Sequence, residues 1–264
     1  MNNAKGFRSP LMITVTTWKA LFLREAVARL AAGRSAWVWL LLEPVFQIVF
    51  LLVIMTQMRV NTIGGIDTVV WLVIGLIFAN LFKRTSSQAQ HAINANQALY
   101  TYRQVKPVDT VLVRAALEGF LMTVIGLILV AGASLLGYDF APTEAWVLLG
   151  AFLNIWFLAL GLGLIASIGV LLIPELEKII SFVNIPIYML SGVAIPISAV
   201  PEPYQQWLMY NPIVHSIESA RKAMSGYYHT NPNLDLFYTT EAALFTVFIG
   251  LSLHSRFVAK VYKK

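Results

Sequence analysis

Four polar residues in the last third of the chain have the spacing of a site on one helix. His215, Glu218 and Arg221 follow one another at intervals of three, and Lys222 stands four residues after Glu218. On a helix these intervals place Glu218 beside the other three. A metal site is disfavoured because further ligands are missing, and an acid–base site lacks a nucleophile or a second carboxylate. A structural charge network is the default, with contact to a substrate headgroup as the alternative.

Three further charged residues lie within apolar stretches. Glu43 is followed by Pro44, and an acid inside a membrane span is a functional candidate, although pairing near a helix kink is an equal alternative. Arg114 and Glu118 are four residues apart, so we expect them to pair with each other. All three residues are therefore candidates for structural or gating charges.

Several kinds of chemistry are excluded by what the sequence lacks. There is no cysteine, which excludes disulfides, iron–sulfur clusters and thiol catalysis. The four histidines contain no closely spaced metal-binding pair, and no serine nucleophile motif occurs. The phosphate-binding G-x-x-x-x-G-K-[ST] loop is also missing, so any energy from ATP must come from another subunit. We therefore expect no cofactor in this chain.

The elements that must position these residues follow from the composition. Of the 264 residues, 58% are hydrophobic and only 12% are charged, whereas soluble domains carry about 25% charged residues. The mean hydropathy is +0.71, and several apolar runs are long enough to cross the ~30 Å hydrocarbon core as helices. The sequence therefore predicts an all-α polytopic membrane protein and excludes a soluble fold.

Six membrane-spanning helices are predicted. They cover residues 36–57, 66–82, 111–138, 145–173, 179–200 and 237–253. With both termini in the cytoplasm, only Arg59, Arg221 and Lys222 of the 19 Lys and Arg residues lie outside. Positive charge is retained on the cytoplasmic side, so the net charge of +6 indicates membrane topology rather than nucleic-acid binding.

Three connecting segments carry further information. Residues 10–34 have an amphipathic pattern that predicts a cytoplasmic interface helix ending in a hinge at Gly33, although a simple positive anchor is the alternative. Residues 83–109 form the longest cytoplasmic connection, which could dock a partner. Residues 201–228 are rich in proline and aromatic residues, with Asn211 as N-cap and Pro212 as first helical residue. We expect two short outer re-entrant helices there, or a surface belt of aromatic residues.

The chain resembles the permease subunits of ABC-2-type polysaccharide exporters, above all the capsular branch. The resemblance covers about residues 20–228, although residues 27–34 depart from the family pattern. The segments that carry it are Ala20–Glu25, Trp39–Pro44, Val105–Asp109, Arg114–Glu118, Pro186–Gly192 and Tyr210–Arg221.

This resemblance implies an exporter of two permeases and two P-loop ATPase subunits, with ATP and magnesium on the ATPases. The cargo would be a capsular polysaccharide, anionic and lipid-linked, that leaves the cytoplasm across a bacterial inner membrane. A periplasmic adaptor and an outer-membrane channel would receive it. The interface helix and the 83–106 connection would dock the ATPases. The coupling candidates are Lys19, Arg24, Arg29, Arg103, Lys106, Glu175 and Glu177.

In the same family picture the first and fifth spans line the canal and the outer helices gate it. Aromatic faces offer sequence-tolerant stacking to a sliding polymer, by analogy with nucleic-acid strands, although interface aromatics also anchor proteins in lipid. Basic groups could attract an acidic glycan, or contact lipid or the adaptor. The canal candidates are Trp37, Trp39, Phe46, Phe50, Tyr188, Tyr204, Trp207, Tyr210, Arg59, Arg221 and Lys222.

Two other functions stay open on the sequence alone. One is ABC-2 export of O-antigen, a lipid or a drug. The other is a membrane enzyme of glycan assembly, which is disfavoured because no paired catalytic acids lie in a large outer loop.

Overall fold

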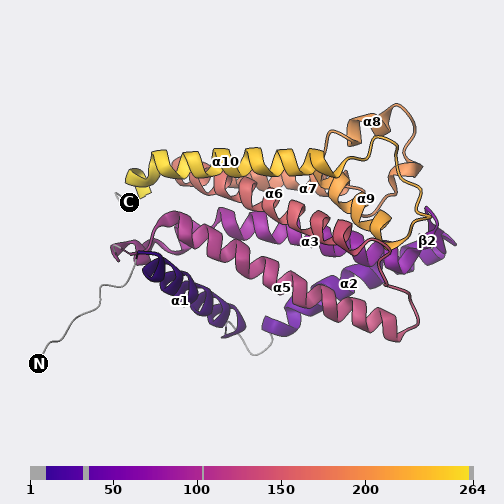
Figure 1. Ribbon diagram of the computed structural model, residues 1–264, viewed down its shortest axis with the longest axis horizontal. Coiled ribbons are helices and arrows are strands. Elements are labelled where there is room, and N and C mark those ends of the chain that lie inside the picture. The colour runs from indigo at the N-terminus through magenta and orange to yellow at the C-terminus, as the bar shows by residue number, and fades with distance from the viewer. Residues whose placement is uncertain (1–9, 32–35, 103, 262–264) are drawn as a thin grey trace, which may run out of the picture.

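A computed structural model describes residues 10–31, 36–102 and 104–261 as a bundle of helices (Figure 1). The predicted hinge at Gly33 and the coupling candidate Arg103 lie outside these residues. The α-helices are α1 (Pro10–Ala31), α2 (Ala36–Gln57), α3 (Thr68–Gln90), α4 (Ala92–Ala95), α5 (Pro107–Leu135), α6 (Ala145–Leu172), α7 (Leu176–Met189), α8 (Tyr204–Leu208), α9 (Pro212–Met224) and α10 (Leu236–Val261). Two 3₁₀ turns, η1 (Gln97–Thr101) and η2 (Ile197–Ala199), complete the helical elements.

Five segments among the described residues are long and apolar enough to cross a membrane as helices. They are Val38–Gln57, Thr68–Gln90, Pro107–Leu135, Ala145–Leu172 and Leu236–Phe257. The all-α class is therefore confirmed, with one short two-stranded hairpin as the exception.

The helix predicted for residues 179–200 is shorter than expected. α7 has 14 residues, a length of about 21 Å, which is less than the ~30 Å hydrocarbon core. Pro186 removes one backbone donor inside it, and the chain turns away at Gly192, whose φ is 76°. One uninterrupted helix over the predicted fifth span is therefore wrong.

The central helix α3 positions both charge clusters described below. Its N-terminus is capped by Asp67, whose side chain accepts a hydrogen bond of 2.7 Å from the backbone N–H of Val69. α3 packs against α2, α5, α6 and α9, and Trp71, Leu72 and Leu81 are fully buried. Residues 68–82 of α3 are all buried, as expected for the mainly apolar part of a helix in the middle of a bundle.

The predicted 83–109 connection is partly helical. α3 continues past the expected end at Phe82 as far as Gln90, and α4 and η1 follow. α5 begins at Pro107, where the Asp109 carboxylate accepts a 3.0 Å hydrogen bond from the backbone N–H of Lys106. Two polar residues of these extra turns bond neighbouring helices: Arg84 pairs with Glu118 of α5, and Gln88 accepts a 3.0 Å hydrogen bond from Arg29 of α1.

A hairpin joins α2 to α3. Its strands β1 (Thr62–Ile63) and β2 (Ile66–Asp67) are antiparallel, with Thr62 opposite Asp67. Gly64 and Gly65 have φ values of 59° and 96°, which a two-residue turn of this hand requires. The carbonyl of Gly64 accepts a 2.9 Å hydrogen bond from the backbone of His229, so the hairpin is tied to the segment after α9.

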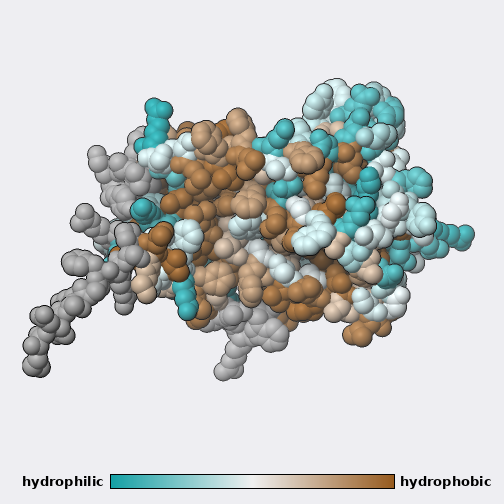
Figure 2. Space-filling model, in the orientation of Figure 1, coloured by the Kyte–Doolittle hydropathy of each residue, from teal (hydrophilic) through white to brown (hydrophobic). Residues whose placement is uncertain are grey.

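The two ends of the bundle differ in composition. α1 and the C-terminal end of α10 lie at one end, and α8 and the hairpin lie at the other (Figure 1). Figure 2 shows apolar side chains across the middle of the molecule and hydrophilic ones around α8 and β2. A broad apolar band beside a polar end is a surface expected of a protein in a bilayer.

Candidate functional site: two buried charge clusters and a cytoplasmic groove

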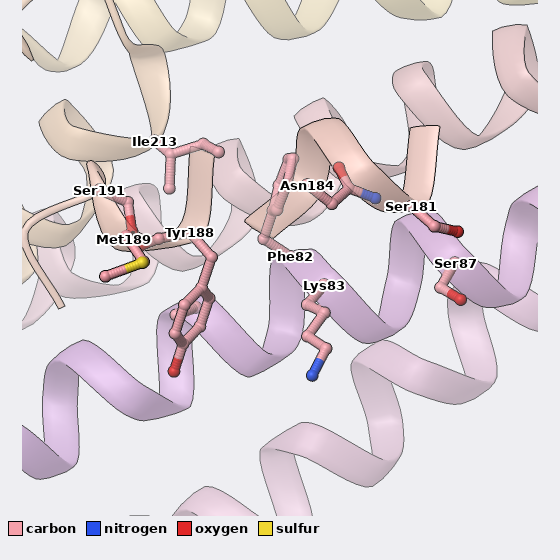
Figure 3. Close-up of a pocket in the computed structure, with 10 residues that line it drawn as sticks. Phe82, Lys83, Ser87, Ser181, Asn184, Tyr188, Met189, Ser191 and Ile213 are labelled. Atoms are coloured by element: carbon pink, nitrogen blue, oxygen red, sulfur yellow. Dashed lines mark hydrogen bonds between the residues drawn. The ribbon is translucent and has the colours of Figure 1, made fainter. Parts of the chain in front are cut away.

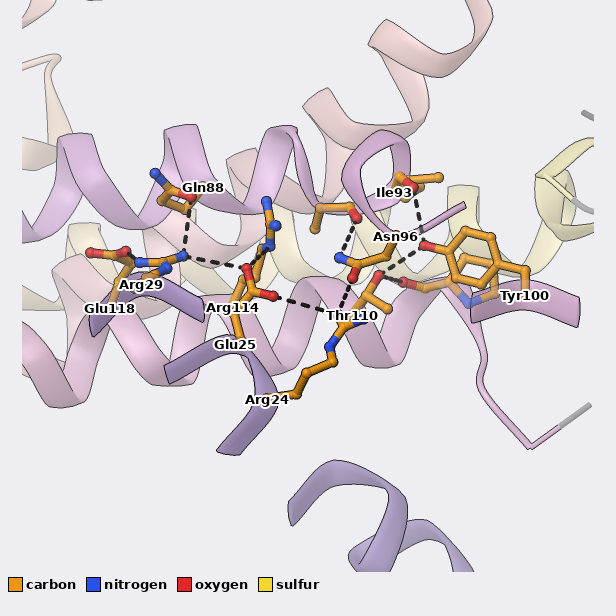
Figure 4. A network of polar contacts seen from close by, with 12 residues as sticks. Arg24, Glu25, Arg29, Gln88, Ile93, Asn96, Tyr100, Thr110, Arg114 and Glu118 are labelled. Atoms are coloured by element: carbon orange, nitrogen blue, oxygen red, sulfur yellow. Dashed lines mark hydrogen bonds and ion pairs between the residues drawn. The ribbon is translucent and has the colours of Figure 1, made fainter. Parts of the chain in front are cut away.

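Glu118 on α5 is the centre of a charge cluster at the α1 end of the bundle (Figure 4). Its side chain is fully buried, and it forms ion pairs with Arg29 of α1 and Arg84 of α3. The Arg84 Nε lies 3.2 Å from Glu118 Oε2, and its Nη1 lies 3.3 Å from Glu43 Oε2 of α2. One buried carboxylate therefore holds α1, α3 and α5 together.

Glu25 of α1 is the second acceptor in the same cluster. Its carboxylate lies 2.6 Å from Arg114, 3.5 Å from Arg24 and 3.9 Å from Arg29. The predicted Arg114–Glu118 pair is therefore wrong. Because α1 packs against α5, Glu25 pairs with Arg114. Glu118 pairs instead with Arg29 of α1 and Arg84 of α3.

The cluster borders a cavity of about 620 Å³ that Arg24, Arg29, Arg84 and Arg114 line together with Glu25. Burial lowers the pKa of Arg29 to about 10, while Glu25 opposes this shift. Arg29 still carries its charge at neutral pH, and its side chain is only 17% exposed. This coupling candidate is therefore paired with Glu25 and Glu118 of its own chain.

An open groove of about 480 Å³ separates α1 from the segment that precedes α5. Thr17 and Arg24 line one wall, and Leu99, Tyr102 and Gln104 line the other. Tyr102 is 65% exposed, so a large ring stands free beside the groove.

The remaining coupling candidates are on the surface. Lys19 on α1 and Lys106 at the start of α5 are exposed, as are Glu175, which precedes α7, and Glu177 in its first turn. A hydrogen bond of 2.9 Å from the Trp18 indole to Asp109 fixes α1 beside α5. Lys19 and Lys106 therefore stand on neighbouring elements.

Arg221 on α9 is the centre of a second cluster, at the opposite end of the bundle. It is completely buried, and its Nη1 donates to Glu218 Oε1 at 2.7 Å and to the Gly192 carbonyl at 2.8 Å. The guanidinium carbon lies 3.5 Å from the centre of the Trp71 ring, within range of a cation–π contact. Arg221 thus ties the end of α7 to α3 and α9.

Tyr228 completes this outer cluster. Its hydroxyl donates to Glu218 Oε2 at 3.0 Å and accepts from the Trp71 indole at 3.0 Å. Burial, followed by the neighbouring Glu218 carboxylate, raises the pKa of Tyr228 above its usual value. The hydroxyl therefore stays protonated and able to donate.

The other two residues of the 215–222 pattern point elsewhere. His215 Nδ1 accepts from the backbone N–H of Asp235 at 3.0 Å, so Nε2 carries the hydrogen that is donated to the Met209 carbonyl at 2.7 Å. Lys222 is exposed. Within this pattern Glu218 is therefore paired only with Arg221, because His215 bonds Met209 and Asp235 and Lys222 is exposed.

Gly75 gives Arg221 its space, and this leads to a prediction. A Cβ atom at Gly75 would clash with the Arg221 guanidinium, whereas one at Gly126 of α5 would lie 3.5 Å from Ile77, at ordinary contact distance. We expect Gly75→Ala to destabilise the protein by about 1–3 kcal/mol through overpacking. Thermal unfolding in detergent micelles, with Gly126→Ala as the control, measures this. Equal melting temperatures for the two variants would contradict the assigned close contact.

The aromatic canal candidates lie in several places. On α2, Trp39, Phe46 and Phe50 are 62%, 68% and 57% exposed, and the Phe46 and Phe50 rings stack with centroids 6.4 Å apart. The side chain of Trp37 lies outside the described part of the structure. Arg59, just after α2, is exposed.

The outer aromatic candidates are separate from those of α2. Tyr204 and Trp207 on α8, and Tyr210 after it, are all largely exposed, whereas Tyr188 on α7 is half-buried. Within the described part of the chain, the aromatic candidates therefore do not form a single site.

Sequence spacing gave no indication of the partners that complete the two clusters. Arg84 pairs with Glu118, 34 residues away, and Trp71 contacts Tyr228, 157 residues away. In the sequence, Arg84 was only one of the many basic residues predicted on the cytoplasmic side. Among the described residues, no group of three or more histidine and acidic side chains could hold a metal ion.

Comparison with known proteins gives consistent matches. Residues 16–225 match the family model described as ABC-2 type transporter. The polysialic acid transport protein KpsM of Escherichia coli is 34% identical over 94% of this chain and 95% of its own. The capsule polysaccharide export inner-membrane proteins CtrC of Neisseria meningitidis (24% identical, 96% and 95% covered) and BexB of Haemophilus influenzae (26% identical, 83% of both chains) are also similar.

Proposed function

This chain belongs to the family of ABC-2 type transporter membrane proteins, and we propose that it is the permease of a capsular polysaccharide exporter. It moves the polymer from the cytoplasm across the bacterial inner membrane to the periplasm. The observation that carries this proposal is the 34% identity to a polysialic acid transport protein over nearly the full length of both chains. The chain is a transport subunit rather than an enzyme.

The proposal includes separate ATPase subunits that hold ATP and magnesium, because the sequence has no P-loop. They dock at the groove between α1 and the segment before α5, which is open and bordered by the exposed Tyr102. A second copy of the permease, a periplasmic adaptor and an outer-membrane channel complete the machine.

We also propose the orientation in which both described ends of the chain face the cytoplasm. The location of α1 and the end of α10 at the same end of the bundle supports it (Figure 1). The short α7, followed by the turn at Gly192 and the helices α8 and α9, acts as the fifth membrane element. In this arrangement α2 and α7 line the canal, and α8 and α9 gate its outer mouth.

The coupling surface makes a prediction about assembly. Changing both Lys19 and Lys106 to Glu reverses two exposed charges beside the groove, and we expect weaker co-purification of the ATPase because charge complementarity steers docking. About a tenfold loss of affinity is expected for a combined change of about 1.4 kcal/mol. The matched control is Lys222→Glu, an exposed reversal at the opposite end. Undiminished complex with full ATPase stimulation would exclude this surface.

The function itself is tested by deleting the gene and locating the polymer. Full-length polymer trapped inside the cell is the result expected of an exporter. Short unpolymerised precursor would instead indicate an enzyme of glycan assembly. Normal capsule with a trapped O-antigen, lipid or drug would assign the chain to another kind of ABC-2 exporter.

A further inference from the structure

A groove between α3 and α7 is separate from both charge clusters. It encloses about 280 Å³, and its polar lining comes from Lys83 and Ser87 on α3 and from Ser181, Asn184 and Tyr188 on α7. Figure 3 shows these side chains on the two facing helices. None of them except Tyr188 was expected to contact cargo from the sequence.

Lys83 is an exposed charge that forms no ion pair with the described residues. It lies within Thr68–Gln90, a helix with the length and composition of a membrane span. The adjacent Arg84 takes both nearby carboxylates, Glu43 and Glu118. Among the described residues no carboxylate lies within ion-pair distance of Lys83, and the groove has no acidic lining. An intramembrane cation without a partner marks a functional site that faces a cavity or pathway.

The polar residues of α7 are spread along the length of the helix. Ser181, Asn184 and Tyr188 recur at intervals of three and four, so they share one face of the helix, and Ser191 follows just after the helix ends. From Ser181 to Tyr188 the helix rises about 10 Å, which is a third of the ~30 Å hydrocarbon core. Lipid headgroups need polar contacts only at the interface. A ligand with polar groups along its length fits this depth better.

The lining has the chemistry of a site for a hydroxylated anion. The hydroxyls of Ser181 and Ser191 donate to the carbonyls of Glu177 and Tyr188 in α7, so their oxygens can still accept. The Asn184 amide and the Tyr188 hydroxyl have no partner among the described residues and can bond sugar hydroxyls. Phe82 adds an apolar wall. An apolar pocket with a few placed polar groups is typical of ligand sites.

We propose that this groove is the part of the canal that selects acidic glycans, with the Lys83 ammonium binding a sugar carboxylate and Asn184 and Tyr188 binding sugar hydroxyls. The proposal rests on the proposed function and adds to it the residues that recognise the acidic cargo. Lys83 is exposed, so the contact is a single ion pair that solvent can screen, and it holds each sugar weakly enough for the polymer to slide.

The test uses the permease–ATPase complex in nanodiscs of phosphatidylcholine. The probes are a sialic acid oligomer and the same oligomer with its carboxyls reduced to alcohols. We expect the wild type to bind the acidic oligomer about tenfold more tightly, the factor expected for one charged hydrogen bond. Lys83→Met should remove this preference and Lys83→Arg should keep it. Tyr188→Phe, which retains the ring, should weaken both oligomers by a similar factor.

The control is Arg256→Met, which removes an exposed cation of α10 at the same end of the molecule. A preference that survives in Lys83→Met, or that is missing in the wild type, overturns the proposal. If neither oligomer binds, but retention of added phosphatidylglycerol depends on Lys83, the lysine serves a lipid headgroup and the proposal is also overturned. Polymer export by cells carrying these variants is measured separately, so failure of this site leaves the exporter function standing.

Discussion

Replacing Arg221 with Met is expected to lower the stability of the protein by about 3–5 kcal/mol. Arg221 is completely buried, and its guanidinium bonds the Glu218 carboxylate and the carbonyl of Gly192. Without it, Glu218 remains inside the bundle with Tyr228 as its hydrogen-bond partner. A buried charge that loses its counterion is costly because water cannot replace the lost contact. Thermal unfolding in nanodiscs should show a fall of about 10 °C.

Two companion variants test whether the loss of stability comes from an unpaired buried charge. Lys222→Met removes the neighbouring charge from an exposed position and should change the melting temperature little, since isolated surface substitutions fall within about 0.5 kcal/mol. The double variant Glu218→Gln with Arg221→Met removes both buried charges and should recover part of the loss. A melting temperature of Arg221→Met equal to that of the wild type would refute the buried pair.

Replacing Glu118 with Ala is the second change with a large expected effect. The Glu118 carboxylate is fully buried and is shared by Arg29 and Arg84. Its removal leaves two guanidinium groups close together with less compensation, so we expect a loss of about 3–5 kcal/mol. Because Arg29 belongs to α1, the helix should also detach more easily. Limited proteolysis around α1, together with thermal unfolding, measures both effects.

Glu43 offers a matched control for Glu118. It pairs with the same arginine, Arg84, at 3.3 Å, but its side chain is 47% exposed. Exposed pairs contribute about 0–1 kcal/mol because water and salt screen them, so Glu43→Gln should have a small effect. If Glu43→Gln destabilised the protein as much as Glu118→Ala, burial would not be the reason for the importance of Glu118.

Substitutions in the two clusters should change the stability of the protein independently. Arg29, Arg84 and Glu118 lie at the α1 end, whereas Arg221 and Glu218 lie at the opposite end. Substitutions more than about 10 Å apart with no shared partner are usually additive. A variant that combines Glu118→Ala with Gly75→Ala should therefore lose the sum of the two single effects.

The sequence by itself determined the helical membrane class, the location of most spans and the family. Long apolar runs are local signals, because a helix must satisfy its own backbone hydrogen bonds in lipid. The N-terminus of α9 was equally local: Asn211 accepts from the backbone of Ile213 at 3.1 Å, as the Asn–Pro pair predicted. The family followed from blocks of residues spread along the chain.

The tertiary structure alone decided which charges meet. Arg114 and Glu118 have the spacing of a helical pair, yet Glu25 from α1 takes Arg114 and Arg29 and Arg84 take Glu118. Helical spacing describes only neighbours on one helix, whereas these partners come from helices that become adjacent only when the bundle packs. The same limit applies to the break after α7 and to the unpaired Lys83. Both depend on the side chains of neighbouring helices, which sequence spacing does not show.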